Sequence, residues 1–296
     1  MRKKINPSIF WAILAAVLYA ASVPASKLLL QEVPPTMMAA LLYLGAGIGM
    51  FLLGLVRKRL IKRPFKQHFA RNDLPYTIGM IILDIAAPIL LMIGLAKTTS
   101  ANASLLNSFE IVATSVIALV VFKEVISRRL WLAIGLITLS SILLSFEDYG
   151  ALHFSIGSIY VLLACICWGF ENNCTRMISQ RDPLEIVIIK GFGSGLGALV
   201  IAFTVGEQLP SYEYIPLVLL LGFVSYGLSI FFYVYAQRKL GASKTSACYA
   251  VTPFIGTALS FLIFRDLPSI LFYLALAVML LATYLTSTDN AGQIDG

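Results

Sequence analysis

The sequence predicts an all-α integral membrane protein with ten transmembrane helices, and three observations support that fold class. Hydrophobic residues make up 59% of the 296 residues and charged residues only 12%, whereas a soluble domain carries about 25% charged residues. Apolar stretches recur along the whole chain, and about 20 apolar residues suffice for a helix to cross a bilayer. Basic residues gather in alternate connections between these stretches.

Ten apolar stretches have the length expected of a membrane-spanning helix. They cover residues 9–30, 36–56, 74–95, 98–121, 130–146, 156–179, 184–205, 213–236, 242–264 and 267–287. The connections are mostly short, so we expect no soluble domain between them. The four cysteines all lie inside these stretches, where cysteine behaves as a small apolar side chain. The sequence therefore predicts no metal site, no disulfide and no cofactor.

The net charge of +7 reports on membrane topology. The connection over residues 57–73, RKRLIKRPFKQHFARND, holds seven Lys/Arg residues, whereas connections on the other side carry acidic residues such as Glu32, Glu147 and Glu207. This alternation follows the positive-inside rule, which places basic connections in the cytoplasm. Both termini are therefore predicted to be cytoplasmic. We expect the protein to lie in a lipid bilayer and to bind no nucleic acid.

The two halves of the chain repeat one pattern. A shift of 149 residues aligns 11–35 with 160–184 and pairs Lys27 with Arg176, and a shift of 142 aligns the fourth span with the ninth. Each half holds five spans, an odd number, so the second half must enter the membrane from the opposite side. Such inverted repeats are typical of transporters, whose binding site lies between the repeats near the midplane. A duplication without a transport role is the alternative.

This symmetry predicts the domain organisation. Residues 1–148 form the first five-helix repeat, residues 149–290 form the second, inverted repeat, and residues 291–296 form a C-terminal tail.

The fourth and ninth spans carry motifs that resemble a known family. They read SANASLLNSFEIVATSVIALVVFKE (100–124) and KTSACYAVTPFIGTALSFLIFRD (244–266), each with a small, hydroxyl-rich start and a charged end after a long apolar run. These motifs, together with ten spans in inverted halves, resemble the EamA-like branch of the drug/metabolite transporter superfamily. The resemblance covers almost the whole chain and implies a ten-helix secondary transporter, commonly an exporter of amino acids or other small metabolites. The second motif departs from the family's usual Glu by ending in Asp266.

Three acidic residues lie deep inside the spans and are the leading candidates for a substrate or proton pathway: Asp84, Glu110 and Glu171. A charge at the centre of a bilayer costs about 2.5–3.5 kcal/mol, so these side chains should face protein or water. Ser22 and Thr252 occupy the repeat positions of Glu171 and Glu110, so the shared scaffold does not itself require the acids. The alternative is that they only hold neighbouring helices together.

Further polar and aromatic residues share helix faces with these acids. We expect the aromatic residues to contact the apolar part of a solute and the asparagines to bond its polar groups, while Glu171 or Asp84 takes a proton or holds an ammonium group. Lys190 is expected to snorkel to the cytoplasmic surface, or otherwise to pair with Glu171 or a substrate carboxylate. The full candidate set adds Asn107, Asn172, Asn173, Trp168, Tyr226, Tyr233, Tyr249 and Lys190.

The sequence thus favours a secondary active exporter of a small molecule that works by alternating access, with proton coupling allowed by the buried acids. The alternative is an uncoupled facilitator or channel for small polar solutes or organic cations. An enzyme acting on lipid-linked substrates would place its catalytic groups at the membrane interface, whereas the acids lie at mid-depth, so no enzymatic activity is expected. Short connections favour a prokaryotic plasma membrane as the location.

Overall fold

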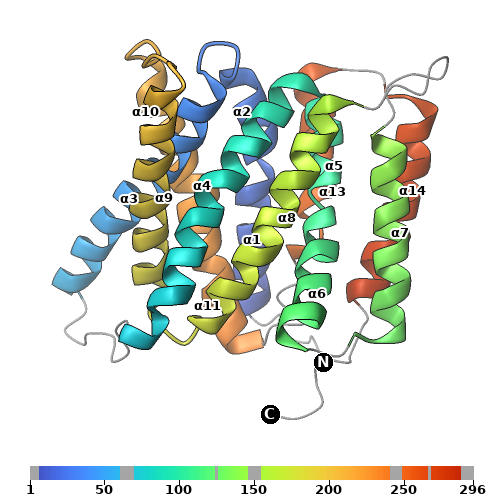
Figure 1. The fold of residues 1–296 in the computed structure, drawn as a ribbon, viewed down its shortest axis with the longest axis horizontal. Helices are drawn as coiled ribbons and strands as arrows, with labels where there is room; N and C mark the ends of the chain where they lie inside the picture. Colours follow the sequence, from blue (N-terminus) through green and yellow to red (C-terminus); the bar gives the residue numbers. More distant parts are fainter. Residues whose placement is uncertain are drawn as a thin grey trace.

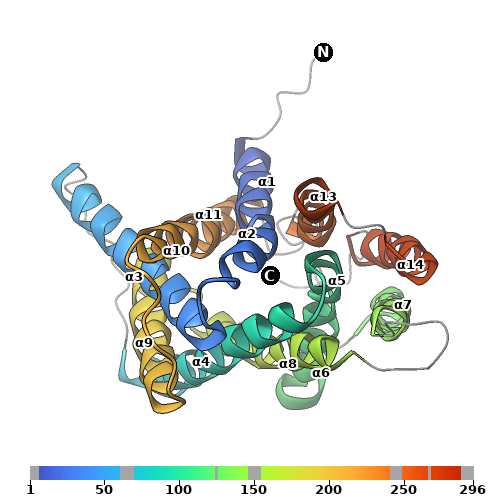
Figure 2. The same ribbon diagram turned by 90° about the horizontal axis from the view of Figure 1, so that it is seen from above.

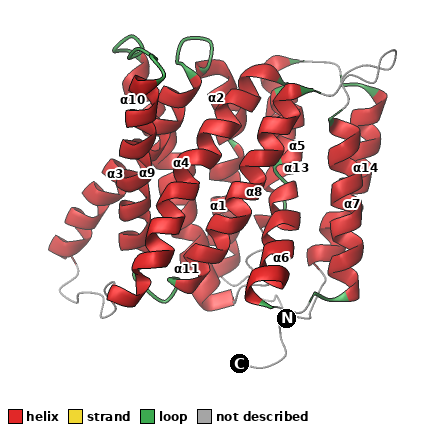
Figure 3. Cartoon of the chain, viewed as in Figure 1, coloured by secondary structure: helices red, strands yellow, loops and turns green. Residues whose placement is uncertain are grey.

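The computed structural model describes residues 7–60, 70–123, 126–145, 155–240, 249–265 and 268–287, and within these ranges it contains helices and no strand (Figure 3). Six segments of the described chain are apolar and long enough to cross a membrane: Ser8–Leu29, Pro35–Arg57, Arg71–Lys97, Ser100–Val121, Pro183–Thr204 and Tyr214–Ala236. The prediction of an all-α, multi-pass membrane protein is confirmed. The motif ends Glu124 and Asp266, Cys248 and the tail 291–296 lie outside the described residues.

The helices follow the apolar stretches of the sequence. In the first half they are α1 (Pro7–Ala20), α2 (Ser22–Leu29), α3 (Pro35–Leu60), the short 3₁₀ turn η1 (Arg71–Asp73), α4 (Leu74–Lys97), α5 (Ser100–Leu106), α6 (Phe109–Phe122) and α7 (Arg128–Leu144). In the second half they are α8 (Ile156–Met177), α9 (Pro183–Thr204), α10 (Tyr214–Gly222), the π-helical turn η2 (Phe223–Leu228), α11 (Ser229–Leu240), α13 (Thr252–Phe264) and α14 (Ile270–Ser287).

Polar residues fix where several of these helices begin. The first backbone N–H groups of a helix have no partner within the helix, and a side-chain oxygen at the preceding residue can accept from one of them. Thr99, Ser127, Ser155 and Asp182 accept such bonds before α5, α7, α8 and α9. These four residues therefore set where α5, α7, α8 and α9 begin.

The helices stand side by side as one bundle (Figure 1). Viewed from above, α3, α9 and α10 lie at one end, and α7 pairs with α14 at the other (Figure 2). The most extensive contacts join α4 to α8 and α3 to α9. Helices α4 and α8 thus pack closely along each other, and Asp84 and Glu171 on these helices are buried by protein.

Three of the apolar stretches are interrupted halfway along. The first bends at Ala21, between α1 and α2, the fourth turns at Asn107 and Ser108, between α5 and α6, and η2 interrupts the eighth. Interrupted helices are tolerated at membrane depth only where the freed backbone is enclosed by protein or lines a water-filled space, and π-turns recur at functional sites. The interruptions therefore mark the interior of the bundle as the place to look for a site.

Candidate functional site

Three charged side chains meet inside the bundle. Lys190 Nζ of α9 lies 3.1 Å from Asp84 Oδ2 of α4 and 3.0 Å from Glu171 Oε1 of α8. Asp84 is 0% exposed and Glu171 is 1% exposed, so bulk water screens neither charge. One ammonium group bridges two carboxylates, and the Asp84–Lys190–Glu171 cluster carries one excess negative charge when all three groups are ionised.

The prediction that Lys190 snorkels to the surface is wrong. Its side chain is only 9% exposed, and its ammonium group points at the two carboxylates. An unpaired buried carboxylate is strongly destabilising, and the ammonium group lies where it forms an ion pair with each of the two acids. Pairing with Glu171 was the expected alternative, whereas the second contact, to Asp84, brings in a helix that the sequence did not connect with Lys190.

Two hydroxyl groups complete the cluster. The Tyr43 hydroxyl of α3 donates to Asp84 Oδ1 at 2.9 Å, and the Thr175 hydroxyl donates to Glu171 Oε1. Trp168, one turn before Glu171 on α8, contacts the Tyr43 hydroxyl. Sequence reasoning did not include Tyr43 in the site. The available signal was a tyrosine within an apolar span, because a buried phenol hydroxyl needs a hydrogen-bond partner.

The bond from Tyr43 to a buried charge predicts a measurable effect. Tyr43→Phe removes one hydrogen bond to the Asp84 carboxylate, and bonds to charged groups contribute about 1.5–3 kcal/mol each. We expect the variant to unfold at a lower temperature in detergent than the unaltered protein, as followed by tryptophan fluorescence. Tyr212→Phe is the control because Tyr212 is 87% exposed. Equal melting temperatures for the two variants would contradict a supporting role for Tyr43.

A chain of tyrosines leads away from the cluster. The ring centroid of Tyr226, in η2, lies 5.3 Å from that of Tyr43 and 5.7 Å from that of Tyr19. Tyr19 lies 5.9 Å from Tyr249, which lies 4.9 Å from Tyr233. The structure therefore brings the three predicted tyrosines together with two further ones in one cluster of contacting rings.

Buried hydroxyl groups accompany the tyrosines. Ser104, Ser108 and Ser225 are at most 3% exposed, and in the described part of the chain their hydroxyls have no hydrogen-bond partner. Buried polar groups in folded proteins are nearly always hydrogen-bonded. Ser108 lies at the interruption between α5 and α6, and Ser225 lies in η2, so two of these hydroxyls fall where the helices are irregular.

Glu110 and the asparagines form a second polar group between α6 and α8. Asn172 Nδ2 donates to Glu110 Oε1 at 2.6 Å and to the Thr114 hydroxyl at 3.3 Å. Asn173 Nδ2 donates to the backbone oxygens of Thr114, at 3.2 Å, and of Gly169, at 2.8 Å. Glu171 and its two following amides therefore face different partners, although they are adjacent in the sequence.

Asn107 stands apart from these amides. It ends α5 at the interruption before α6, and the Cys165 thiol of α8 lies 3.9 Å from both its side-chain and its backbone oxygen. Its position at the interruption keeps it within the polar interior, but no described contact links it to Asn172 or Asn173.

Two ion pairs near the end of α3 and the starts of α4 and α9 were not foreseen. Arg181 Nε lies 2.8 Å from Asp73 Oδ2, and Arg57 lies 3.3 Å from Asp182 Oδ2. They link the segment before α9 to the beginning of α4 and to the end of α3. Sequence spacing gave no sign of these pairs, because their partners lie 125 and 108 residues apart along the chain.

Comparisons with known proteins find one transporter family and two transporter relatives. The EamA-like transporter family matches this chain twice, over residues 6–146 and 155–288. A protein described as an uncharacterized transporter of Methanothermobacter thermautotrophicus is 25% identical over 290 residues, which cover 92% of this chain and 84% of that protein. The uncharacterized transporter YyaM of Bacillus subtilis is 21% identical over 233 residues, 75% of each protein.

A solved structure has the same fold as this chain. A chain titled only as a crystal structure of a protein superposes with a TM-score of 0.70, covers 99% of each chain and is 15% identical to this one. At that identity the likeness concerns the fold alone.

Proposed function

The chain belongs to the EamA-like transporter family and is therefore a membrane transporter, and from this premise we propose that it is a secondary active exporter of small metabolites such as amino acids, working by alternating access. The observation that carries the proposal is the Asp84–Lys190–Glu171 cluster. Ionisable groups buried in a membrane protein are costly and usually mark a transport pathway.

The proposed architecture is ten spans in two inverted five-helix repeats, over residues 1–148 and 149–290, with cytoplasmic termini. The contacts of α4 with α8 and of α6 with α8 have counterparts in those of α11 with α1 and of α13 with α1, as an inverted repeat requires. Lys123 and Arg265, 142 positions apart, both end a helix with positive φ, 58° and 55°. Archaeal and bacterial relatives support a prokaryotic plasma membrane.

The cluster suits a transport cycle because of its charge. Two carboxylates and one ammonium group leave one negative charge, which a proton or a substrate ammonium group would neutralise. Neutralising a buried charge removes a large desolvation penalty, so the helices that hold the cluster could then repack toward the other side of the membrane. The cluster joins α4 to α9 and α8. Helix α4 belongs to the first proposed repeat, whereas α8 and α9 belong to the second. Proton coupling follows if the neutralising species is a proton.

An uncoupled facilitator is the second candidate function. Lys190 already forms an ion pair with both acids in this conformation, and a facilitator requires nothing more of the cluster than helix packing. Transport against a gradient, or accelerated exchange of labelled for unlabelled solute, would distinguish a carrier from a pore.

Glu171→Gln tests the proposal. We expect solid-supported-membrane recordings of proteoliposomes challenged with pooled amino acids, organic cations and nucleobases to show a pool-specific current. The amide cannot carry charge, so the variant's current should fall by about tenfold or more. Glu213→Gln, at an exposed position at the start of α10, is the control. A Glu171→Gln current equal to that of the unaltered protein would overturn the role of the cluster.

A further inference from the structure

The charged cluster lies close to one end of two of the helices that hold it. Glu171 is six residues before the end of α8, and Lys190 is seven residues after the start of α9. At about 1.5 Å per residue, about 10 Å of helix separates each from that end. The ends of α3 and α8 and the starts of α4 and α9 lie on this same side, at the bottom of Figure 1. It is termed the basic side, because the basic connection over residues 57–73 leaves α3 and enters α4 there.

An apolar layer lies between the cluster and the basic side. Met80, Ile178 and Ile186 pack as one group and are at most 4% exposed. Met80 lies one turn before Asp84 on α4, and Ile186 lies one turn before Lys190 on α9. In both helices the apolar residue therefore shares a face with the charged one and is nearer the basic side. Ile178 adds the end of α8 to this layer.

Two of the ion pairs described above tie the helix ends together beyond the apolar layer. Arg181 donates to both carboxylate oxygens of Asp73, at 2.8 and 3.2 Å, and Arg57 lies 3.3 Å from Asp182. Asp73 and Asp182 directly precede α4 and α9. A guanidinium group that bonds both oxygens of a carboxylate fixes the geometry of the pair. The pairs therefore hold together helix ends that belong to both proposed repeats.

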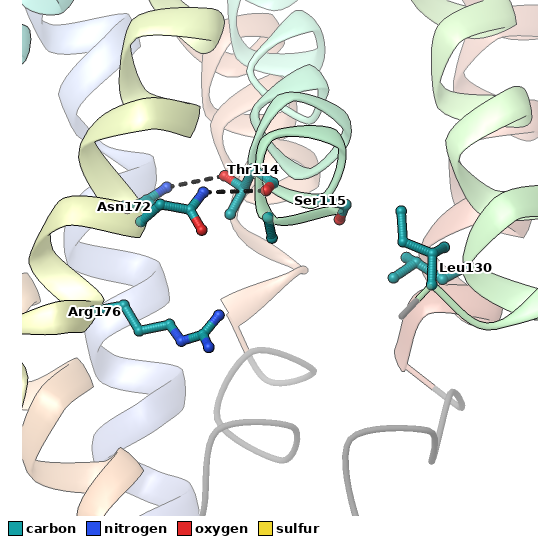
Figure 4. Close-up of a pocket in the computed structure, with 8 residues that line it drawn as sticks. Thr114, Ser115, Leu130, Asn172 and Arg176 are labelled. Atoms are coloured by element: carbon teal, nitrogen blue, oxygen red, sulfur yellow. Dashed lines mark hydrogen bonds between the residues drawn. The ribbon is translucent and has the colours of Figure 1, made fainter. Parts of the chain in front are cut away.

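Helix α8 separates this layer from a different region of the protein. Asn172 and Arg176 point toward a cavity of 170 Å³ that Thr114 of α6 and residues of α7 also line (Figure 4). Cys174 and Ile178 instead pack with the apolar layer, on the side of α4 and α9. Changes at the ion pairs therefore act on the charged cluster without directly altering that cavity.

We infer that Met80, Ile178 and Ile186 form a gate on the path by which water and protons reach the charged cluster from the basic side, and that the two ion pairs hold this gate closed. Apolar constrictions block ions because water does not occupy them, and a buried carboxylate exchanges protons only when water or another carrier reaches it. The inference rests on the proposed function, because it names the route to the cluster of that transporter. In this conformation the gate is closed, since Met80 is 0% exposed.

Cysteine labelling measures whether this gate opens. The reporter is Met80→Cys in a protein whose four native cysteines are replaced by alanine. The purified full-length protein in nanodiscs would be labelled with the membrane-impermeant cation 2-(trimethylammonium)ethyl methanethiosulfonate, and mass spectrometry would follow the rate. We expect slow labelling while the ion pairs are present. Replacing both Arg57 and Arg181 with glutamine should raise the rate by about tenfold, because partly exposed ion pairs contribute modestly and two are lost.

Matched variants separate opening of the gate from general loosening of the bundle. Met92→Cys is the control, because Met92 also lies on α4 and is 0% exposed, about three turns further from the basic side. Its labelling rate should not change when the ion pairs are removed. Tyr212→Cys, at a position that is 87% exposed, should label rapidly in every protein and so reports on the reagent.

Two further substitutions test the ion pairs themselves. Asp73→Asn removes one pair from its acidic side and should raise the rate of Met80→Cys by about threefold. Arg57→Gln combined with Arg181→Lys keeps one positive charge and should label more slowly than the protein with two glutamines. All variants should elute as monodisperse protein before their rates are compared.

The outcomes distinguish this inference from the proposed function, because labelling needs no substrate. Rapid labelling of Met80→Cys with both pairs present, or an unchanged rate without them, overturns the gate. An equal rise at Met80→Cys and Met92→Cys also overturns it, since the whole bundle would then have loosened. A gate that opens as expected in a protein without any solute-driven current would stand while the exporter proposal falls, and the current test on Glu171→Gln is unaffected by failure of the gate.

Discussion

Replacing Lys190 with methionine is expected to destabilise the folded protein by about 3–5 kcal/mol and to abolish transport. Methionine keeps much of the apolar stem but leaves the Asp84 and Glu171 carboxylates buried without their counter-ion. Removing one partner from a buried ion pair typically destabilises a protein by about 3–5 kcal/mol, because the remaining charge is uncompensated. In this cluster two like charges remain. The unfolding temperature in detergent, followed by tryptophan fluorescence, checks the stability, and solid-supported-membrane currents check the transport.

Neutralising the acids tests the physical reason for this loss. In the triple variant Asp84→Asn, Lys190→Met, Glu171→Gln no charge remains in the cluster, and uncharged replacements for a buried ion pair are often neutral or stabilising. We expect the triple variant to regain most of the unfolding temperature that Lys190→Met loses relative to the unaltered protein, while transport remains absent. A Lys190→Met protein as stable as the unaltered one would show that the ammonium group does not compensate these acids. Equal instability of the single and triple variants would show that the cost arises from packing.

Replacing Gly191 with alanine is expected to destabilise the protein by about 1–3 kcal/mol, although alanine is the better helix former. A Cβ at Gly191 would press on the backbone of Gly47, in α3, and lie 2.9 Å from the Tyr43 carbonyl oxygen. These are backbone atoms of a neighbouring helix and cannot move aside without shifting it. The contact also lies one position from Lys190 and holds α3, with Tyr43, against α9, so transport should fall as well.

Gly135→Ala is the matched control for this prediction. Nothing lies within 4 Å of a Cβ built at Gly135, on α7, so alanine there should stabilise the helix by up to about 0.8–1.0 kcal/mol. Opposite shifts in unfolding temperature for the two Gly→Ala variants would establish that α3 and α9 approach through their glycines. Shifts of the same sign would contradict that close approach.

Part of the candidate site followed from single residues in the sequence. An acid such as Asp84 or Glu171 within an apolar span had to be enclosed, because lipid does not solvate a charge, and both are buried in the structure. Lys190 illustrates the limit of this reasoning. A lysine about two turns from a helix end can reach the surface, and only the positions of α4 and α8 relative to α9 determine that it reaches two carboxylates instead.

Tyr43, Arg181 and Glu110 show a related limit, because each has a partner on another helix or segment. The hydroxyl of Tyr43 bonds an acid 41 residues away, and Arg181 pairs with an acid 108 residues away. Sequence spacing predicts which residues share a face of one helix, but it does not predict which faces of two helices meet. Asn172 and Glu110 were both candidates, yet their hydrogen bond depends on how α6 packs on α8.

The sequence by itself determined that the chain is a helical membrane protein, which family it resembles and which polar residues lie within its spans, because hydrophobicity, charge alternation and repeated motifs are properties of residues along one chain. Only the tertiary structure decided that Lys190 forms ion pairs with Asp84 and Glu171 together and that Glu110 accepts a hydrogen bond from Asn172 instead. Both results depend on distances of about 3 Å between helices, and helix packing alone sets such distances.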